Sequence, residues 1–344
     1  MKQGKAAYIF PGANTAQGYR SFFREGLNGL DQIFILKGGP GCGKSTLIRG
    51  VGQLMQEKGY DVEFWQCSSD VDSLDGVLIP ELKAAIIDGT PPHTVEPLYP
   101  GAVEELVDLG SCWNSAELRR QKADIVALNQ QISGKYALCR EALAQAAELL
   151  ARSRENLAPS EEWSSDLLER IFGLKEQNSR HLFASSVTPR GWVSFLEPLS
   201  QRAKRRFILT GPFGGGKERL LNAVALEAQQ RHLYAELYHH PLAVEELQMI
   251  WLPALETAVI GVEEAPPERE GDVVINCGRT ADEARAAEER RRIRELTDEG
   301  GQRIAEAKAL HDRLEECYSK AMDYQRVDEM KAGLLTRLLA LARE

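Results

Sequence analysis

The chain has 344 residues, which is enough for two domains of ordinary size. A hydrophobic content of 43% and a charged content of 27% are ordinary for a globular protein, and the formal net charge of −9 argues against broad, non-specific binding to nucleic acid or anionic membranes. No stretch approaches the ~18 uninterrupted apolar residues of a membrane span, and six scattered cysteines without a C-x-x-C pair favour reduced thiols. We expect a cytoplasmic protein, with membranes and nucleic acid disfavoured as partners.

The first part of the chain alternates short apolar runs with amphipathic segments. Apolar runs of three to six residues bounded by glycine or polar residues are typical of buried strands, and a period of about 3.6 residues is typical of helices. Residues Leu47, Val51 and Leu54 give one such helix directly after a glycine-rich loop. In chain order, we expect a strand at 8–10, a helical segment at 18–30, a strand at 33–36 and the helix from 44 onward. Strands at 62–67, 84–87 and 106–109 follow.

A helical arm is expected after each set of strands, at about 113–157 and 279–320. In the first arm apolar residues recur every seven positions at Leu118, Ile125, Ile132 and Cys139. Ser133-Gly134 interrupts the first arm, and Gly300-Gly301 interrupts the second. Because glycine is costly inside a helix, we expect two antiparallel helices in each arm instead of one long helix.

The second half of the chain repeats the first. At an offset of 173 residues, which places Phe183 against Phe10, the halves align without a gap through the strands and the glycine-rich loop. After a short deletion the alignment resumes at an offset of 168, which places Gly278 against Gly110. The repeat is too long for a solenoid unit and indicates a tandem duplication. We therefore predict two α/β domains at 1–176 and 177–344, each a doubly wound, mainly parallel sheet followed by a helical arm.

One loop in the first domain carries a phosphate-binding pattern. Residues 38–45 read G-G-P-G-C-G-K-S and satisfy G-x-x-x-x-G-K-[ST]. Its glycines let successive backbone N–H groups point at an anion, and the following helix adds its positive N-terminal end. Lys44 is expected to reach the β- and γ-phosphates, and the Ser45 hydroxyl to ligate Mg²⁺. The predicted nucleotide-binding residues are Gly38, Gly39, Pro40, Gly41, Cys42, Gly43, Lys44, Ser45 and Thr46.

This loop, set between a strand and a helix, resembles that of P-loop NTPases. The resemblance implies a doubly wound P-loop fold and a carboxylate at the end of a nearby strand that holds the metal with Ser45. Asp88 ends the apolar run at 84–88 and fits that role; alternatively it is a turn former before the Gly-Thr-Pro-Pro segment. No N-K-x-D string for guanine follows either loop, so ATP and Mg²⁺ are the expected cofactors.

Three further residues are candidates for the chemistry. Asp70 and Asp75 follow the second strand, at the end of the sheet where ligands bind, and could orient an attacking water or hold a phosphate acceptor. The alternative is a solvated acidic loop or a helix cap. His93, five residues after Asp88, is a candidate γ-phosphate sensor; the alternative is a turn histidine without a role.

The corresponding loop of the second domain lacks one metal-binding group. Residues 211–218 read G-P-F-G-G-G-K-E, so Glu218 stands where Ser45 does, and Gly261 stands where Asp88 does. With both metal-ordering groups lost, this site is expected not to hydrolyse nucleotide. It either binds a phosphate or is a structural remnant. Its residues are Gly211, Gly214, Gly215, Gly216, Lys217 and Glu218.

The whole chain resembles a family of bacterial tandem P-loop ATPases. The resemblance rests on the duplication and on the strings K-G-G-P-G-C-G-K-S, C-S-S-D-V-D-S-L-D-G-V and I-I-D-G-T-P-P-H. It implies ATP binding and hydrolysis at the first loop, with Arg190 or Arg219 of the second domain as a candidate charge-stabilising residue. The alternatives are a small-molecule or nucleoside kinase, and an ATP-regulated interaction protein whose helical arms bind a protein partner.

Overall fold

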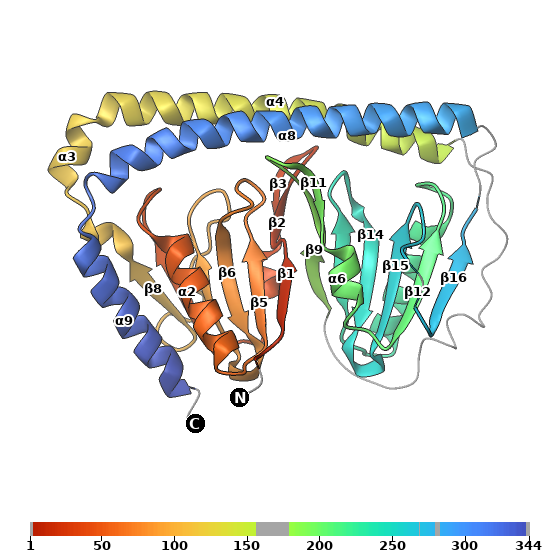
Figure 1. The fold of residues 1–344 in the computed structure, drawn as a ribbon, viewed down its shortest axis with the longest axis horizontal. Coiled ribbons are helices and arrows are strands. Elements are labelled where there is room, and N and C mark those ends of the chain that lie inside the picture. Colours follow the sequence, from red (N-terminus) through yellow and green to blue (C-terminus); the bar gives the residue numbers. More distant parts are fainter. Residues whose placement is uncertain (1–2, 156–178, 268, 279–282, 342–344) are drawn as a thin grey trace.

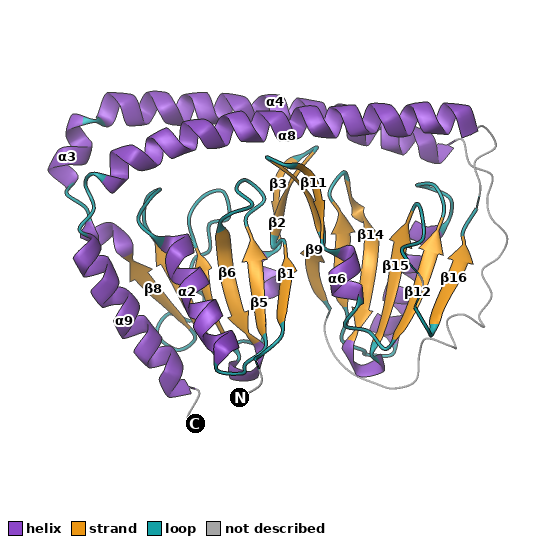
Figure 2. Cartoon of the chain, in the orientation of Figure 1, coloured by secondary structure: helices purple, strands orange, loops and turns teal. Residues whose placement is uncertain are grey.

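The computed structural model describes residues 3–155, 179–267, 269–278 and 283–341. These residues form an α/β fold with two six-stranded sheets, two small hairpins and a layer of long helices over the carboxyl ends of most strands (Figures 1 and 2). The predicted domain boundary at 176/177, and the limits of the arms at 157 and 279, lie outside the described residues.

The first sheet has the strand order β1-β5-β6-β7-β4-β8. Its strands are β1 (Ala6–Ile9), β4 (Gln32–Lys37), β5 (Val62–Gln66), β6 (Leu74–Ile79), β7 (Ala84–Asp88) and β8 (Glu104–Asp108). The predicted mainly parallel sheet is confirmed, but it is mixed because β6 runs antiparallel to both neighbours. Only residues 67–73 connect β5 to β6, and a parallel connection needs a dozen or more residues.

The expected helical segment at 18–30 is wrong in its first part. Gly18–Ser21 is strand β3, which forms an antiparallel hairpin with β2 (Gly12–Thr15), and only Phe23–Gly26 is helical, as α1. Gly18 has φ +108°, and the Thr15 hydroxyl donates to the Gly18 carbonyl at 2.6 Å. This tight turn joins β2 to β3 and prevents a helix from starting at Gly18.

The second sheet repeats the first, with the order β9-β13-β14-β15-β12-β16. Its strands are β9 (Arg180–Phe183), β12 (Arg205–Thr210), β13 (Glu236–His240), β14 (Ala243–Leu252), β15 (Thr257–Val262) and β16 (Asp272–Asn276), and its hairpin is β10 (Ser185–Thr188) with β11 (Gly191–Ser194). The match includes backbone detail. Lys83 and Glu256, which are 173 residues apart, follow equivalent 3₁₀ turns with left-handed φ values of +44° and +47°. The duplication therefore holds in three dimensions.

The two sheets meet at their β1 and β9 edges (Figure 1). Phe10 and Phe183 exchange two backbone hydrogen bonds of 3.0 Å across this junction. Buried side chains from both halves, among them Ile9, Trp65 and Tyr238, form one continuous hydrophobic cluster there, together with the flank of α6 (Leu196–Ser200). The halves thus share a core.

The arms are long single helices, contrary to expectation. Short helix α3 (Ser115–Arg120) leads into α4 (Lys122–Glu155), and α8 (Glu283–Ser319) runs antiparallel beside α4 (Figure 1). Gly300 and Gly301 lie inside α8 without breaking it. They allow α8 to pack closely against its neighbours. A methyl group on Gly301 would lie 2.8 Å from the Thr188 carbonyl oxygen, and one on Gly300 would lie 3.0 Å from Leu143. Among the described residues, no helix is both long and apolar enough to cross a membrane.

Gly134 of α4 and Gly301 of α8 are expected to respond oppositely to replacement by alanine. Gly134 has open space around its Cα, so Gly134→Ala should stabilise the protein by about 0.5–1 kcal/mol. Gly301→Ala, on the same helix pair, should destabilise it by about 1–3 kcal/mol, because the β10–β11 hairpin must move away. Chemical denaturation of the two variants measures this difference. Equal effects would contradict the close-packing explanation.

The last helix packs on the first half of the chain. In α9 (Tyr324–Leu341), Val327, Leu334 and Leu338 are buried against α2 (Lys44–Glu57) and β4. The Arg337 guanidinium lies 2.6 Å from the Glu105 carboxylate on β8. Residues 324–341 therefore complete the core around the first glycine-rich loop, although they follow the second sheet in the sequence.

Candidate functional site

The first glycine loop, residues 38–45, lies between β4 and α2, below the helical arms. Gly41 and Gly43 have φ values of +69° and +86°, which favour glycine, and α2 begins at Lys44. The N-terminal N–H groups of this 14-residue helix therefore point toward the loop, where they favour an anion.

The predicted Lys44, Ser45 and Asp88 are brought together. Asp88 ends β7, the strand beside β4, and its carboxylate lies 3.6 Å from Lys44 Nζ. Lys44 Nζ also donates to the Gly38 and Gly39 carbonyls at 3.0 and 2.9 Å, so the side chain folds back over the loop. The Ser45 hydroxyl accepts a 2.9 Å hydrogen bond from the Leu74 N–H at the start of β6.

Asp88 also forms a turn, as the alternative interpretation expected. Its Oδ1 accepts hydrogen bonds from the Thr90 N–H and hydroxyl at 2.9 and 2.6 Å, while its Oδ2 faces Lys44. One carboxylate therefore serves both the turn and the loop. Ser45 and Asp88 offer hard oxygen donors beside the phosphate loop, a donor set that fits Mg²⁺.

Asp75 and His93 form a buried pair next to Asp88. Both residues are 6% exposed, and His93 Nε2 lies 3.5 Å from Asp75 Oδ1 while His93 Nδ1 contacts the Asp88 carbonyl at 3.0 Å. Burial lowers the pKa of His93, but the Asp75 carboxylate raises it by more, so the pKa lies above its ordinary value. Asp75 is part of β6 and not of an acidic loop, which corrects that expectation.

Asp70 has the structural role that the alternative interpretation allowed. In the acidic loop, residues 67–73 between β5 and β6, its carboxylate accepts from the Asp72 N–H and the Ser73 hydroxyl, both at 3.0 Å. It also lies 3.4 Å from Lys308 Nζ on α8. Asp70 therefore holds the shape of the acidic loop.

A cavity of about 1000 Å³ connects these residues. Every predicted residue of the first loop except Gly39 lines it, as do Asp70, Asp75, Asp88 and His93. Cys42 is 1% exposed, and this burial raises the pKa of its thiol.

The cavity roof comes from the helical arms and had no sequence signal. On α4 the lining residues extend from Asn129 to Arg140, a span of 11 residues or about 16 Å. On α8 they include His311, Glu315 and Ser319, and a methyl group on Gly41 would lie 2.6 Å from Ser319 Oγ. Long-range packing of this kind leaves no local pattern in either segment.

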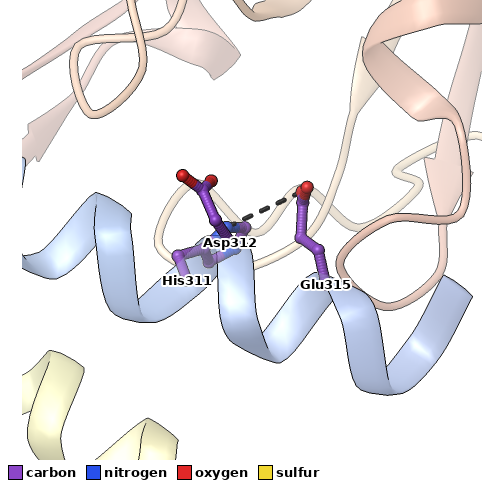
Figure 3. Close-up of side chains that lie close together, drawn as sticks. All are labelled: His311, Asp312 and Glu315. Carbon is purple, nitrogen blue, oxygen red and sulfur yellow. Dashed lines mark ion pairs between the residues drawn. The ribbon is translucent and has the colours of Figure 1, made fainter.

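Charged side chains gather on the same part of α8. His311, Asp312 and Glu315 lie close together, with His311 Nδ1 3.7 Å from Glu315 Oε1 (Figure 3). Asp312 is exposed and pairs with Lys308 at 2.9 Å. Of these three residues, His311 and Glu315 line the cavity.

The second glycine loop is filled by its own side chains. The buried Glu218 carboxylate accepts from the Gly214 N–H at 3.1 Å and lies 3.2 Å from Lys217 Nζ, which also donates to the Gly211 carbonyl at 2.7 Å. The carboxylate thus takes the partners that a phosphate would have. A methyl group on Gly261 would lie 3.0 Å from Leu221, so little space is left for a metal-binding side chain.

Phe213, at the centre of this second loop, packs against the arms. It is buried with Leu143 of α4 and Leu296 of α8. In the first loop Pro40 holds the equivalent position and lines the open cavity. The second loop therefore anchors the helical layer.

The candidate arginines of the second half lie elsewhere. Arg190, at the tip of the β10–β11 hairpin, binds the Asp72 carboxylate at 2.7 Å, and Arg219 is exposed on α7 (Lys217–Gln230). The described residues that line the cavity include neither.

Comparisons of the chain with protein-family models, with curated proteins and with solved structures gave no match. The site is therefore interpreted from its own geometry.

Proposed function

We propose that the protein is a P-loop ATP-binding protein that hydrolyses Mg²⁺–ATP at the first glycine loop. The observation that carries this proposal is an asymmetry. Lys44, Ser45 and Asp88 line a cavity of about 1000 Å³, whereas in the second loop the Glu218 carboxylate accepts the Gly214 N–H and pairs with Lys217. The second loop is accordingly structural.

The proposal assigns roles to the loop backbone, to Lys44 and Ser45, and to the carboxylates and histidine beside the loop. The backbone N–H groups of the loop and the start of α2 surround the phosphates, and Lys44 turns from the Gly38 and Gly39 carbonyls toward the terminal phosphates. Ser45 and Asp88 hold Mg²⁺, which neutralises phosphate charge. The buried Asp75–His93 pair lies next to Asp88, where it can orient the attacking water.

A titration of nucleotide tests this proposal. We expect one ATP per chain, bound only with Mg²⁺, and weaker GTP binding because neither loop is followed by a guanine-reading N-K-x-D string. Ser45→Ala should remove much of the Mg²⁺ dependence. Two nucleotides per chain would contradict the structural role of the second loop, and no binding would reject the proposal.

A small-molecule kinase is the second candidate, because the cavity continues along α4 past the loop. Tyr136 and Arg140 of α4 line it together with Asp75 and His93. Product analysis separates the candidates: a hydrolase releases inorganic phosphate for each ADP formed, whereas a kinase releases ADP without it.

A further inference from the structure

We propose that the acidic loop transmits nucleotide occupancy of the first glycine loop to the second half of the chain. The inference rests on the proposed nucleotide site and adds a regulatory connection to it. Leu74, the residue directly after the acidic loop, hydrogen-bonds the predicted metal-binding hydroxyl, and the loop itself pairs with two cations of the second half.

The link to the nucleotide site is the hydrogen bond from the Leu74 N–H to Ser45 Oγ, at 2.9 Å. Leu74 directly follows the acidic loop and begins β6. A metal held by Ser45 Oγ would take one of the two lone pairs of this oxygen and reorient the hydroxyl, which would weaken the hydrogen bond from Leu74. Binding of Mg²⁺ and nucleotide would therefore loosen the Leu74–Ser45 contact that holds the end of the acidic loop. Arg49, on α2, also donates to the Asp72 carbonyl, so the loop is fixed to the helix that follows the phosphate site.

The link to the second half consists of two ion pairs. Arg190, in the turn of the β10–β11 hairpin, places Nη2 2.7 Å from the Asp72 carboxylate, and Lys308 on α8 places Nζ 3.4 Å from that of Asp70. Arg190 and Asp72 are 62% and 72% exposed, so this contact contributes little to stability and can open and close without unfolding the protein.

Helix α8 connects both ends of this system. Its Gly301 packs against Thr188 and Gly191 of the same hairpin, and its last turn packs on Gly39 and Gly41 of the phosphate loop through Tyr318 and Ser319. The hydroxyl of Tyr324, the first residue of α9, donates to the Gly41 carbonyl at 3.0 Å. A shift of the acidic loop thus acts on α8, which already touches both the first glycine loop and the second half. The position of α8 can therefore couple these two regions.

The test compares the full-length protein with Arg190→Gln plus Lys308→Gln. Amide hydrogen exchange is measured by mass spectrometry with and without Mg²⁺ and the non-hydrolysable analogue AMP-PNP, and a binding titration is run in parallel. In the wild type we expect binding to change exchange about fivefold or more, the lower range of typical site–site couplings, both in 67–74 and in the hairpin at 185–194. The double variant should bind within about twofold of the wild-type affinity and keep the change at 67–74 but lose it in the hairpin.

The matched control is Arg292→Gln, which removes an exposed arginine of α8 that pairs with Glu295 and should leave the hairpin response intact. The reversed pair, Asp72→Arg with Arg190→Asp, should restore the response that Arg190→Asp alone removes. A hairpin response that persists in the double variant, or none in the wild type at saturating AMP-PNP, overturns the inference while leaving the nucleotide site intact. A flat binding titration instead rejects the proposed function and the inference with it.

Discussion

Replacing Lys44 by alanine is expected to lower ATP turnover about 10²–10³-fold, the cost of removing one preorganised charge-stabilising donor. Lys44 is 11% exposed and is held over the loop by the Gly38 and Gly39 carbonyls and by Asp88. In the proposed nucleotide complex its ammonium would turn from these carbonyls toward the terminal phosphates. The measurement is steady-state phosphate release at saturating Mg²⁺–ATP, with thermal unfolding to show that the variant is folded.

The control for Lys44 uses the corresponding lysine of the second loop. Because Lys217 neutralises the buried Glu218, both are replaced together, as Lys217→Gln with Glu218→Gln, so that no unpaired charge stays buried. We expect turnover within about twofold of wild type. Full turnover in Lys44→Ala would place hydrolysis outside the first loop, and loss of turnover in the control would give the second loop a direct role.

The sequence predicted the strands and loop that local pattern determines. Apolar runs located β4 and β7, and the glycine pattern located Lys44 at the start of α2, all near their observed positions. Glu218, at the position that corresponds to Ser45, predicted an altered second site. The contacts that its carboxylate makes in the second loop are seen only in the structure. Glu218 does more than remove a metal ligand, because its carboxylate accepts the Gly214 N–H and pairs with Lys217.

Strand β6 was missed because its sequence contradicts its position. Asp75 and Gly76 interrupt an apolar run, yet the strand lies between β5 and β7 and is buried along its length. The cost of a carboxylate there is offset by His93, which comes from a different loop. No periodicity within 74–79 contains that information.

The roof of the cavity was missed for a related reason. Glycines at 300–301 indicate a helix break when only local propensity is considered, but here they admit the Thr188 backbone. Likewise, Gly39 and Gly41 stand at unrestricted positions of the glycine pattern, and in the structure they make room for Tyr318 and Ser319, which are distant in sequence. The pattern therefore gives no reason for a small residue at these two positions, and the long-range packing does.

Replacing Arg180 by methionine is expected to destabilise the protein by about 3–5 kcal/mol, because it leaves a buried carboxylate without its cation. Arg180 on β9 binds Glu63 on β5 through two contacts of 2.5 and 3.0 Å, across the junction of the two sheets. The Trp65 indole N–H donates to the same carboxylate at 2.7 Å. Urea denaturation followed by tryptophan fluorescence measures the loss.

The pH dependence of this loss identifies its cause. Burial raises the pKa of Glu63, but Arg180 lowers it by more, so the pKa lies below its ordinary value of 4.5. The wild-type pair therefore contributes fully above pH ~4.5, and its contribution is lost as the pH falls through the lowered pKa. In Arg180→Met the uncompensated carboxylate protonates more readily. The difference in unfolding free energy between the two proteins should accordingly begin to narrow above pH ~4.5, where Glu63 of the variant takes up its proton, and narrow further below pH ~4.5 as the wild-type pair is lost.

Two further variants separate charge from packing at this junction. Adding Glu63→Gln to Arg180→Met should recover much of the lost stability, since the amide oxygen still accepts from Trp65 and the neighbouring buried Glu236 keeps Arg202 as its cation. Lys204→Met, which breaks the exposed pair with Glu256, should change the unfolding free energy by less than about 1 kcal/mol. A loss in Arg180→Met that is independent of pH and unrelieved by Glu63→Gln would instead assign the effect to packing against Trp65. The junction of the halves would then depend on shape and not on the buried ion pair.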